Sequence, residues 1–278
     1  LPFIREVVEV IDRRRVNWTV VPCPGRAWAS LVYPGLPDDE ALERLWQAVE
    51  HVCRLDMPDP IAAWQARAAQ LERAAAALTE LRLDRLRFHG PGTDLTVGLL
   101  PSSRWMAAGE ETVTGIRHLA NVPTEEVFAT PDPERTEGIV RSTKPLLNSG
   151  AVIRDLVVRF ERGRVVQVDA SSGAEVLRGR VAMDDGAARL GEVALVDRES
   201  RIGRLDTVFY ETLLDENAAS HIALGAGFPF GVDEVDNPRV NRSAIHIDFM
   251  IGADDVDVTG VTPDGREMPL LRGGAWQI

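Results

Sequence analysis

VNRSAIHIDFMIG, residues 240–252, alternates between two kinds of side chain. One set is wholly apolar and consists of Ile245, Ile247, Phe249 and Ile251. Because successive side chains of a strand point to opposite faces, this period of two predicts a strand with one face in the core. His246 and Asp248 then project side by side from the other face, where an imidazole and a carboxylate can converge on one cation. A histidine hydrogen-bonded to its neighbouring carboxylate fits the same spacing.

The composition limits the class of protein and its partners. The chain has 278 residues, of which 45% are hydrophobic and 27% charged, as in a soluble globular protein with a sizeable core. The net charge of -12 argues against nucleic acid and against an anionic membrane surface as partners. No apolar run reaches transmembrane length and no signal-peptide pattern opens the chain. Cys23 and Cys53 are the only cysteines, which excludes a disulfide framework and disfavours a cysteine-based zinc site. We therefore expect a cytoplasmic protein.

The chain changes character near residues 82–100. Helical patterns predominate before this point, and we predict helices over residues 3–15, 26–33, 38–55 and 59–81, with a strand at 18–22. After it, strand patterns predominate, at 85–89, 94–99, 191–196, 244–251, 254–262 and 267–278, with a hairpin over 152–171. Two more helices are expected over 173–190 and 215–224. The predicted class is α+β: the remnant of an N-terminal α/β domain over residues 1–90, followed by a β-rich domain over 91–278.

Other acids and histidines stand in apolar or structured settings. Glu125 and Glu126 follow Pro123-Thr124, where Thr124 or Glu125 is also suited to cap a turn. Glu192 opens the apolar run Val193-Ala194-Leu195-Val196, and it is either a surface acid at a strand start or a paired or metal-bound carboxylate. His221 follows an acidic segment; on a helix it shares a face with Asn217, and it is either a structural histidine or a ligand.

Together with His246 and Asp248, these positions supply two glutamates, two histidines and one aspartate. That donor set suits a two-metal hydrolytic site, in which carboxylates bridge and imidazoles fill single positions. The remaining histidines fit less well. His51 lies in the helical region, and nothing in the pattern requires His89 or His118 to line a cleft.

Several motifs occur in an order that closely resembles the M29 metallopeptidases, the thermophilic-type aminopeptidases of the aminopeptidase T group. The matching segments are NVPTEEVF (121–128), RSTKPL (141–146), LGEVALV (190–196), DENAASH (215–221) and VNRSAIHIDFMIG (240–252). The segments WTVVP (18–22), GPGTDL (90–95) and RGGAW (272–276) match as well, so that the resemblance spans nearly the whole chain.

The resemblance implies an N-terminal α/β domain and a C-terminal domain that binds two divalent metal ions. The metal ligands it implies are Glu126, Glu192, His221, His246 and Asp248. Oxygen and imidazole donors admit zinc, cobalt, manganese or magnesium. The expected activity is that of a metalloaminopeptidase, in which the ions activate a water, polarise the scissile carbonyl of a peptide substrate and receive its free α-amino group. The resemblance also implies a homodimer.

Three further roles are assigned as hypotheses. A carboxylate that is not a ligand should take the proton of the water, and Glu125 is our candidate for this catalytic base. Lys144 and Arg141 either stabilise the developing oxyanion or pair with surface acids.

The chain also departs from the family. The family usually has a tyrosine in the turn after the first ligand histidine, where this chain has Phe228, which cannot donate a hydrogen bond or bind metal. The loop over 231–241 looks shorter than usual, and part of the N-terminal domain is expected to be missing. The alternative hypothesis is therefore a disabled relative that binds metal or a protein partner without catalysis.

Overall fold

The computed structural model describes residues 6–7, 10–11 and 13–278. The predicted helix over 3–15 lies in part outside the described residues. The chain forms two compact units, one from Leu1–Glu72 with Ala107–Thr124 and the other from Arg73–Met106 with Glu125–Ile278. The predicted boundary at residues 90 and 91 falls between two paired strands of the second unit. No helix among the described residues is long and apolar enough to cross a membrane.

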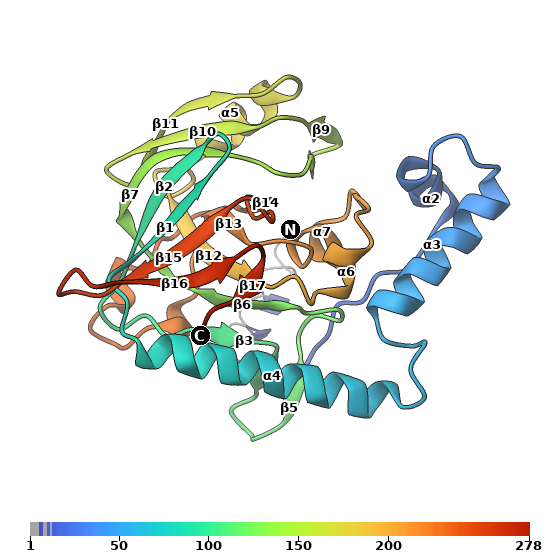
Figure 1. The fold of residues 1–278 in the computed structure, drawn as a ribbon, viewed down its shortest axis with the longest axis horizontal. Coiled ribbons are helices and arrows are strands. Elements are labelled where there is room, and N and C mark those ends of the chain that lie inside the picture. The colour runs from blue at the N-terminus through green and yellow to red at the C-terminus, as the bar shows by residue number, and fades with distance from the viewer. Residues whose placement is uncertain (1–5, 8–9, 12) are drawn as a thin grey trace. The chain divides into compact units, whose positions relative to one another are not determined.

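The first unit is mainly helical (Figure 1). Its helices are α2 (Arg26–Val32), α3 (Asp38–Val52) and the first part of α4 (Pro60–Glu80), and its one hairpin among the described residues pairs β4 (Gly109–Glu111) with β5 (Arg117–Leu119). The acids Asp38, Asp39 and Glu40 occupy the first turn of α3, where they oppose the positive end of the helix dipole. These helices confirm the predictions for 26–33, 38–55 and 59–81. The predicted strand at 18–22 is reduced to a single parallel bridge between Val20 and Asn121.

The second unit contains an eight-stranded antiparallel sheet that forms much of its core. Its strands, in spatial order, are β11 (Arg164–Asp169), β10 (Val157–Glu161), β7 (Pro131–Arg141), β2 (Thr93–Leu99), β1 (Arg85–Gly90), β15 (Asp257–Val261), β16 (Glu267–Arg272) and β17 (Ala275–Trp276). Phe88, Leu95 and Val97 of its central strands are fully buried. The predicted hairpin around Arg162-Gly163 is confirmed, since β10 pairs with β11 across these residues. The short strands β8 (Leu146–Asn148) and β9 (Ala151–Ile153) form a separate hairpin.

A five-stranded sheet in the same unit carries the candidate site. Its order is β14 (His246–Met250), β13 (His221–Gly225), β12 (Leu190–Val196), β6 (Glu126–Ala129) and β3 (Met106–Ala107). Strand β12 is buried at every position, as its apolar run predicts. One face of the sheet is apolar and wholly buried, and its members include Val193, Leu195, Ile222, Leu224 and Phe249. The alternation in residues 244–251 therefore identifies both the strand and its core face correctly.

The prediction of a helix over 215–224 is wrong. Helix α7 covers only Thr212–Glu216, and His221–Gly225 forms strand β13, which lies between β14 and β12. The pattern of the short apolar run Ile222-Ala223-Leu224 fits a buried strand and a helix equally well. Pairing with β12 and β14 makes this segment a strand.

The helix predicted over 173–190 is also shorter than expected. Helix α5 (Ala174–Val181) ends early, and the chain then turns at Asp184-Asp185-Gly186. The carboxylate of Asp184 accepts hydrogen bonds from the backbone N–H of Ala187 and Ala244, at 2.8 Å each, and from the Ser243 hydroxyl at 3.0 Å. These hydrogen bonds hold the turn against the segment that leads into β14. The chain therefore turns at the point where the sequence predicts that the helix continues.

Candidate metal centre

The candidate site occupies the other face of the five-stranded sheet, opposite the apolar face. The register pairs Ala194 with His221, Ala223 with Asp248 and Gly225 with His246. Because directly paired residues of neighbouring strands point to the same face, the polar side chains of β6, β12, β13 and β14 gather there. The residues at the middle of this face, Ala194 and Ala223, are small. They leave room above the sheet for the longer acidic and imidazole side chains around them.

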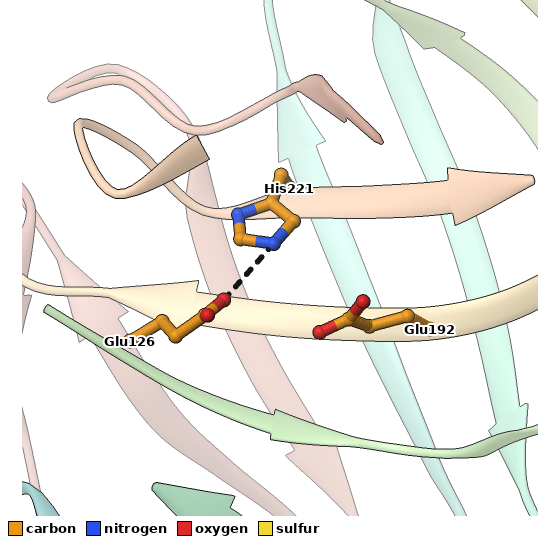
Figure 2. Close-up of side chains that lie close together, drawn as sticks. All are labelled: Glu126, Glu192 and His221. Carbon is orange, nitrogen blue, oxygen red and sulfur yellow. Dashed lines mark ion pairs between the residues drawn. The ribbon is translucent and has the colours of Figure 1, made fainter. Parts of the chain in front are cut away.

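One group of ligand-type side chains consists of Glu126, Glu192 and His221, all of them buried. Figure 2 shows the three side chains pointing toward one another from three neighbouring strands. Nε2 of His221 lies 3.0 Å from Oε2 of Glu126. One ligand atom from each residue lies within 4.8 Å of the others, which is close enough for a single cation to contact all three.

A second group consists of Glu192, His246 and Asp248. Nε2 of His246 lies 3.0 Å from Oε2 of Glu192 and 3.3 Å from Oδ1 of Asp248. The imidazole is the accessible member, with 32% of its side chain exposed, against 6% for Glu192 and 7% for Asp248. Glu192 belongs to both groups, and a carboxylate in this position can bridge two cations through its two oxygens.

Backbone carbonyl groups orient both imidazoles. Nδ1 of His246 lies 2.8 Å from the carbonyl oxygen of Ala226, and Nδ1 of His221 lies 3.3 Å from that of Ala219. A carbonyl only accepts hydrogen bonds, so each Nδ1 carries the proton and donates it, which leaves Nε2 with a free lone pair in the neutral ring. Histidines that bind metals are usually held in this way.

The turn that presents Ala226 is tightly packed. Gly225 has a φ of +104°, and a Cβ atom at this position would lie 2.1 Å from the carbonyl oxygen of Ile245. A Cβ atom at Gly191 would lie 2.2 Å from the Ala226 carbonyl oxygen itself. Only glycine fits at either place without displacing backbone atoms. The two glycines therefore fix the carbonyl group that holds His246.

The electrostatics of the site show an excess of negative charge in a buried place. Burial, together with the charges of Glu126 and Asp248, raises the pKa of Glu192, although its hydrogen bond to His246 opposes the shift. Burial alone would lower the pKa of His221, but Glu126 and the neighbouring carboxylates raise that pKa well above its ordinary value. His246 behaves in the same way, with Asp248 and Glu192 raising its pKa.

Oε2 of Glu126 and Oδ1 of Asp248 are buried and accept no hydrogen bond from the described residues, although Nε2 of His221 and Nε2 of His246 lie 3.0 and 3.3 Å from them. Buried carboxylate oxygens normally have a donor or a cation beside them, because an unpaired buried charge is costly. The donor set is composed of carboxylates and imidazoles, and an imidazole that has lost its Nε2 proton is, like a carboxylate, a ligand for divalent cations. The residues therefore fit one cation in each of the two groups.

Glu216, at the end of α7, is a further acid of the site that we did not predict from the sequence. Burial and then repulsion by Asp248 and Glu126 raise the pKa of its carboxyl group well above the ordinary value, while His221 opposes the shift. The only signal for Glu216 in the sequence is that it lies five residues before His221 and two residues after Leu214, in the apolar pair Leu213-Leu214. That signal does not distinguish Glu216 from its neighbour Asp215, whose carboxylate caps the backbone N–H groups of Phe209 and Glu211 instead.

The remaining predicted site residues have different surroundings. Glu125 is wholly buried directly before β6, and its backbone N–H donates to Oδ1 of Asn217 at 2.6 Å, but it belongs to neither ligand group. Arg141 pairs with Asp155 at 3.2 Å, on the exposed surface. Lys144 is half-buried, and its positive charge acts on Asp215, whose pKa burial raises to about 6. The ring of Phe228 lies against the ring of His246, with 5.4 Å between the centroids.

The other histidines do not belong to either ligand group among the described residues. His51 pairs with Asp56 at 2.8 Å, and Nε2 of His118 lies 3.7 Å from Oε2 of Glu110. His89 lies near the end of β1, where it is paired with Asp94 and Asp257 in the sheet register. From the sequence, these three histidines are weaker candidates for the site than His221 and His246. In the structure they lie outside both groups.

Comparisons with known proteins agree with this geometry. The sequence model of a family described as thermophilic metalloprotease (M29) matches residues 2–276. Aminopeptidase T of Thermus aquaticus is 45% identical over an alignment of 281 positions, which covers 99% of this chain and 69% of that protein. Aminopeptidase 2 of Geobacillus stearothermophilus is 40% identical over an alignment of 267 positions, which covers 93% of this chain and 65% of that protein. The structure of wild-type AmpT from Thermus thermophilus superposes with a TM-score of 0.91 at 43% identity, and the match covers 98% of this chain and 68% of that one.

Proposed function

This chain belongs to the M29 family of thermophilic metalloproteases, and we propose that it is a metal-dependent aminopeptidase that releases the N-terminal residue of peptides. The observation that supports this proposal most strongly is the position of Glu192. Its carboxylate is shared by two groups that each contain a histidine and another carboxylate. Hydrolysis by paired metal ions needs the two cations to lie close together, and a shared acid between two sets of terminal ligands provides that spacing.

The proposed site binds two divalent ions. Glu126, Glu192 and His221 would hold the first, and Glu192, His246 and Asp248 would hold the second. Glu216 adds a carboxylate beside them. Zinc, cobalt, manganese and magnesium all accept oxygen and imidazole donors, and the choice among them depends on their availability as well as on the ligands.

Divalent cations in this position supply Lewis acidity toward a peptide carbonyl and lower the pKa of a water molecule toward neutrality. The chain's own groups bind and orient the substrate. Its free α-amino group is a cation at neutral pH, and the carboxylates of Glu126, Glu192, Asp248 and Glu216 attract it. An internal peptide segment lacks this charge, so the acidic site favours chain ends.

We assign the acceptance of a proton to Glu125, as the base adjacent to a ligand. Support comes from its complete burial directly beside Glu126 and from the hydrogen bond that ties its backbone to Asn217. Lys144 is assigned to charge stabilisation at the carbonyl oxygen, because the residue is half-buried and its positive charge acts on Asp215. Arg141 receives no role, since Asp155 already neutralises it at the surface.

The test is the release of leucine from leucyl-p-nitroanilide by protein stripped of metal and then reloaded with each of the four ions in turn. We expect no release from stripped protein and restored release at about two ions per chain, measured by elemental analysis. The alternative of a disabled relative is not favoured, because all five ligand-type residues are present and close together. Metal binding without any release would support that alternative.

The assembly and compartment are part of the same proposal. We expect a homodimer, which light scattering coupled to size exclusion checks directly. A cytoplasmic enzyme agrees with the free thiols of Cys23 and Cys53, since reduced cysteines are the rule in that compartment.

A further inference from the structure

A buried asparagine, Asn241, lies five residues before His246 in the segment that leads into β14. Only 7% of the residue is exposed. Its amide Nδ2 donates hydrogen bonds to three carbonyl oxygens, those of Gly225 at 2.6 Å, Gly186 at 2.8 Å and Arg189 at 3.3 Å. One side chain therefore joins the turn before β12 and the end of β13 to the approach of β14.

The backbone of Asn241 also holds the turn after β13. Its carbonyl oxygen accepts a hydrogen bond from the backbone N–H of Gly227 at 2.9 Å. The N–H of Ala226 donates to the carbonyl oxygen of Ile245 at 2.8 Å. Together with the bond from Nδ2 to the Gly225 carbonyl, these contacts fix the peptide units on both sides of Ala226.

The peptide unit between Ala226 and Gly227 connects Asn241 to the metal centre. A trans peptide unit is planar, so its N–H and C=O groups point in opposite directions. The N–H of Gly227 points to the Asn241 carbonyl, and the carbonyl of Ala226 points the other way, where Nδ1 of His246 lies 2.8 Å from it. Asn241 and His246 thus contact opposite sides of one rigid group, and the position of Asn241 determines the direction of the imidazole.

The other histidine of the site is held by a different part of the chain. Nδ1 of His221 lies 3.3 Å from the carbonyl oxygen of Ala219, which precedes β13, whereas Asn241 contacts the far end of that strand. The side chain of His221 is 1% exposed, against 32% for His246. Packing therefore encloses the first ring, while the second depends more on its hydrogen bond. A change at Asn241 should disturb His246 and spare His221.

We propose that Asn241 is a positioning residue for His246. It sets the affinity of the ion bound by the second ligand group, which contains His246, and not that of the first group, which contains His221. This inference rests on the proposed two-ion site. A ring that is already oriented loses less conformational freedom when it binds metal than a ring that can turn. Groups that orient a metal ligand directly are worth about 10–100-fold in metal affinity. Asn241 acts through one peptide unit, and we expect an effect at the lower end of this range.

The experiment titrates metal-stripped protein with zinc and measures the affinities of the two ions by calorimetry in the presence of a competing chelator. His246→Ala, which retains only the first ligand group complete, identifies the titration step that belongs to the second. Asn241→Ala should weaken the ion of the second group by about tenfold and leave the other unchanged. Asn241→Ser, which keeps one hydroxyl donor, should lose less.

Asn237→Ala is the matched control. Asn237 lies in the same segment between β13 and β14, and its Nδ2 donates to the carbonyl oxygen of Pro229 at 3.1 Å. This variant also removes an asparagine that holds a backbone carbonyl, but one outside the peptide units that flank Ala226. It should change neither affinity.

A second measurement needs no metal. In a crystal structure of stripped Asn241→Ser, Nδ1 of His246 should lie farther from the Ala226 carbonyl oxygen than the 2.8 Å of the wild type, with His221 unmoved. Circular dichroism and thermal melts show whether each variant is folded, and if Asn241→Ala is not, Asn241→Ser carries the test.

Equal losses at both ions, no loss at either in a folded variant, or failure of both variants to fold would overturn the inference, because Asn241 would then be a structural residue only. Wild-type protein that binds no zinc would overturn the proposed site and this inference with it. Two bound ions without turnover would contradict the proposed function alone.

Discussion

Nδ1 of His246 lies 2.8 Å from the carbonyl oxygen of Ala226, twenty residues earlier in the chain. This contact turns Nε2 of the imidazole toward Glu192 and Asp248, so the ring is aimed at the site by the backbone. The carbonyl belongs to the turn after Gly225 and packs against Gly191 of β12, and neither glycine admits a side chain. The most accessible of the ligand-type residues is therefore held at a fixed orientation, which would reduce the conformational entropy lost on metal binding.

Removal of metal should abolish activity and lower the melting temperature. The site concentrates four carboxylates and two imidazoles in a buried place, and metal bound only to the folded state stabilises it by mass action. At a free metal concentration of 100 times Kd, one site adds about 2.7 kcal/mol. Melting curves and leucyl-p-nitroanilide turnover before and after chelation measure both effects. Full turnover in protein shown by elemental analysis to be metal-free contradicts the metal-dependent mechanism.

Glu192→Gln and His246→Ala should both remove activity without unfolding the chain, but they should differ in metal content. Glu192 is shared by the two groups, whereas His246 belongs to one. We expect loss of both ions in Glu192→Gln and of one in His246→Ala. His51→Ala, at a histidine paired with Asp56 outside these groups, is the matched control and should keep both ions. Normal turnover of either site variant with metal bound would show that the ligand assignment is wrong.

Phe228→Tyr should raise turnover. The ring is half-buried against His246, and a hydroxyl added there stands at the border of the site. A single hydrogen bond to a transition state is worth about 10²–10³ in turnover. If the hydroxyl is instead buried without a partner, it costs about 1–3 kcal/mol. Kinetics and thermal melts of the variant decide the matter: an unchanged rate with a lowered melting temperature contradicts the prediction.

Asp184→Asn should destabilise the protein at neutral pH and much less in strong acid. Hydrogen bonds from the backbone N–H of Ala244 and from the Ser243 hydroxyl lower the pKa of Asp184 below 3.8. A carboxyl group with a lowered folded-state pKa stabilises the fold above its unfolded pKa, and this contribution disappears as pH falls through the folded value. The difference in melting temperature between wild type and variant should therefore shrink below about pH 3.8. Asp185→Asn, at an exposed neighbour, is the control. A difference that persists unchanged in acid would exclude the linkage.

Of the four strands that carry ligand-type residues, the sequence predicts β12 and β14. Strand β14 could be identified because its alternation is long enough to exclude a helix, and this also placed His246 and Asp248 on one face. The strand of His221 could not, since Ile222-Ala223-Leu224 is too short a run to separate the two periods, and only pairing with β12 and β14 decides. The position of Glu216 in the site could not be predicted either. Its surroundings come from strands distant in the sequence, and the raised pKa of its carboxyl group exists only once they meet.

Each ligand-type residue of the two groups comes from β6, β12, β13 or β14, and the apolar and polar faces of these strands alternate with a period of two. A slip of one residue in the pairing of β13 with β14 would turn His246 and Asp248 into the core and Ile247 toward the acids. Such a sheet keeps Glu126, Glu192 and His221 together but loses the group of Glu192, His246 and Asp248. Binding of a second ion would therefore discriminate between correctly and incorrectly paired chains, and in a refolding mixture it would favour only the correctly registered form.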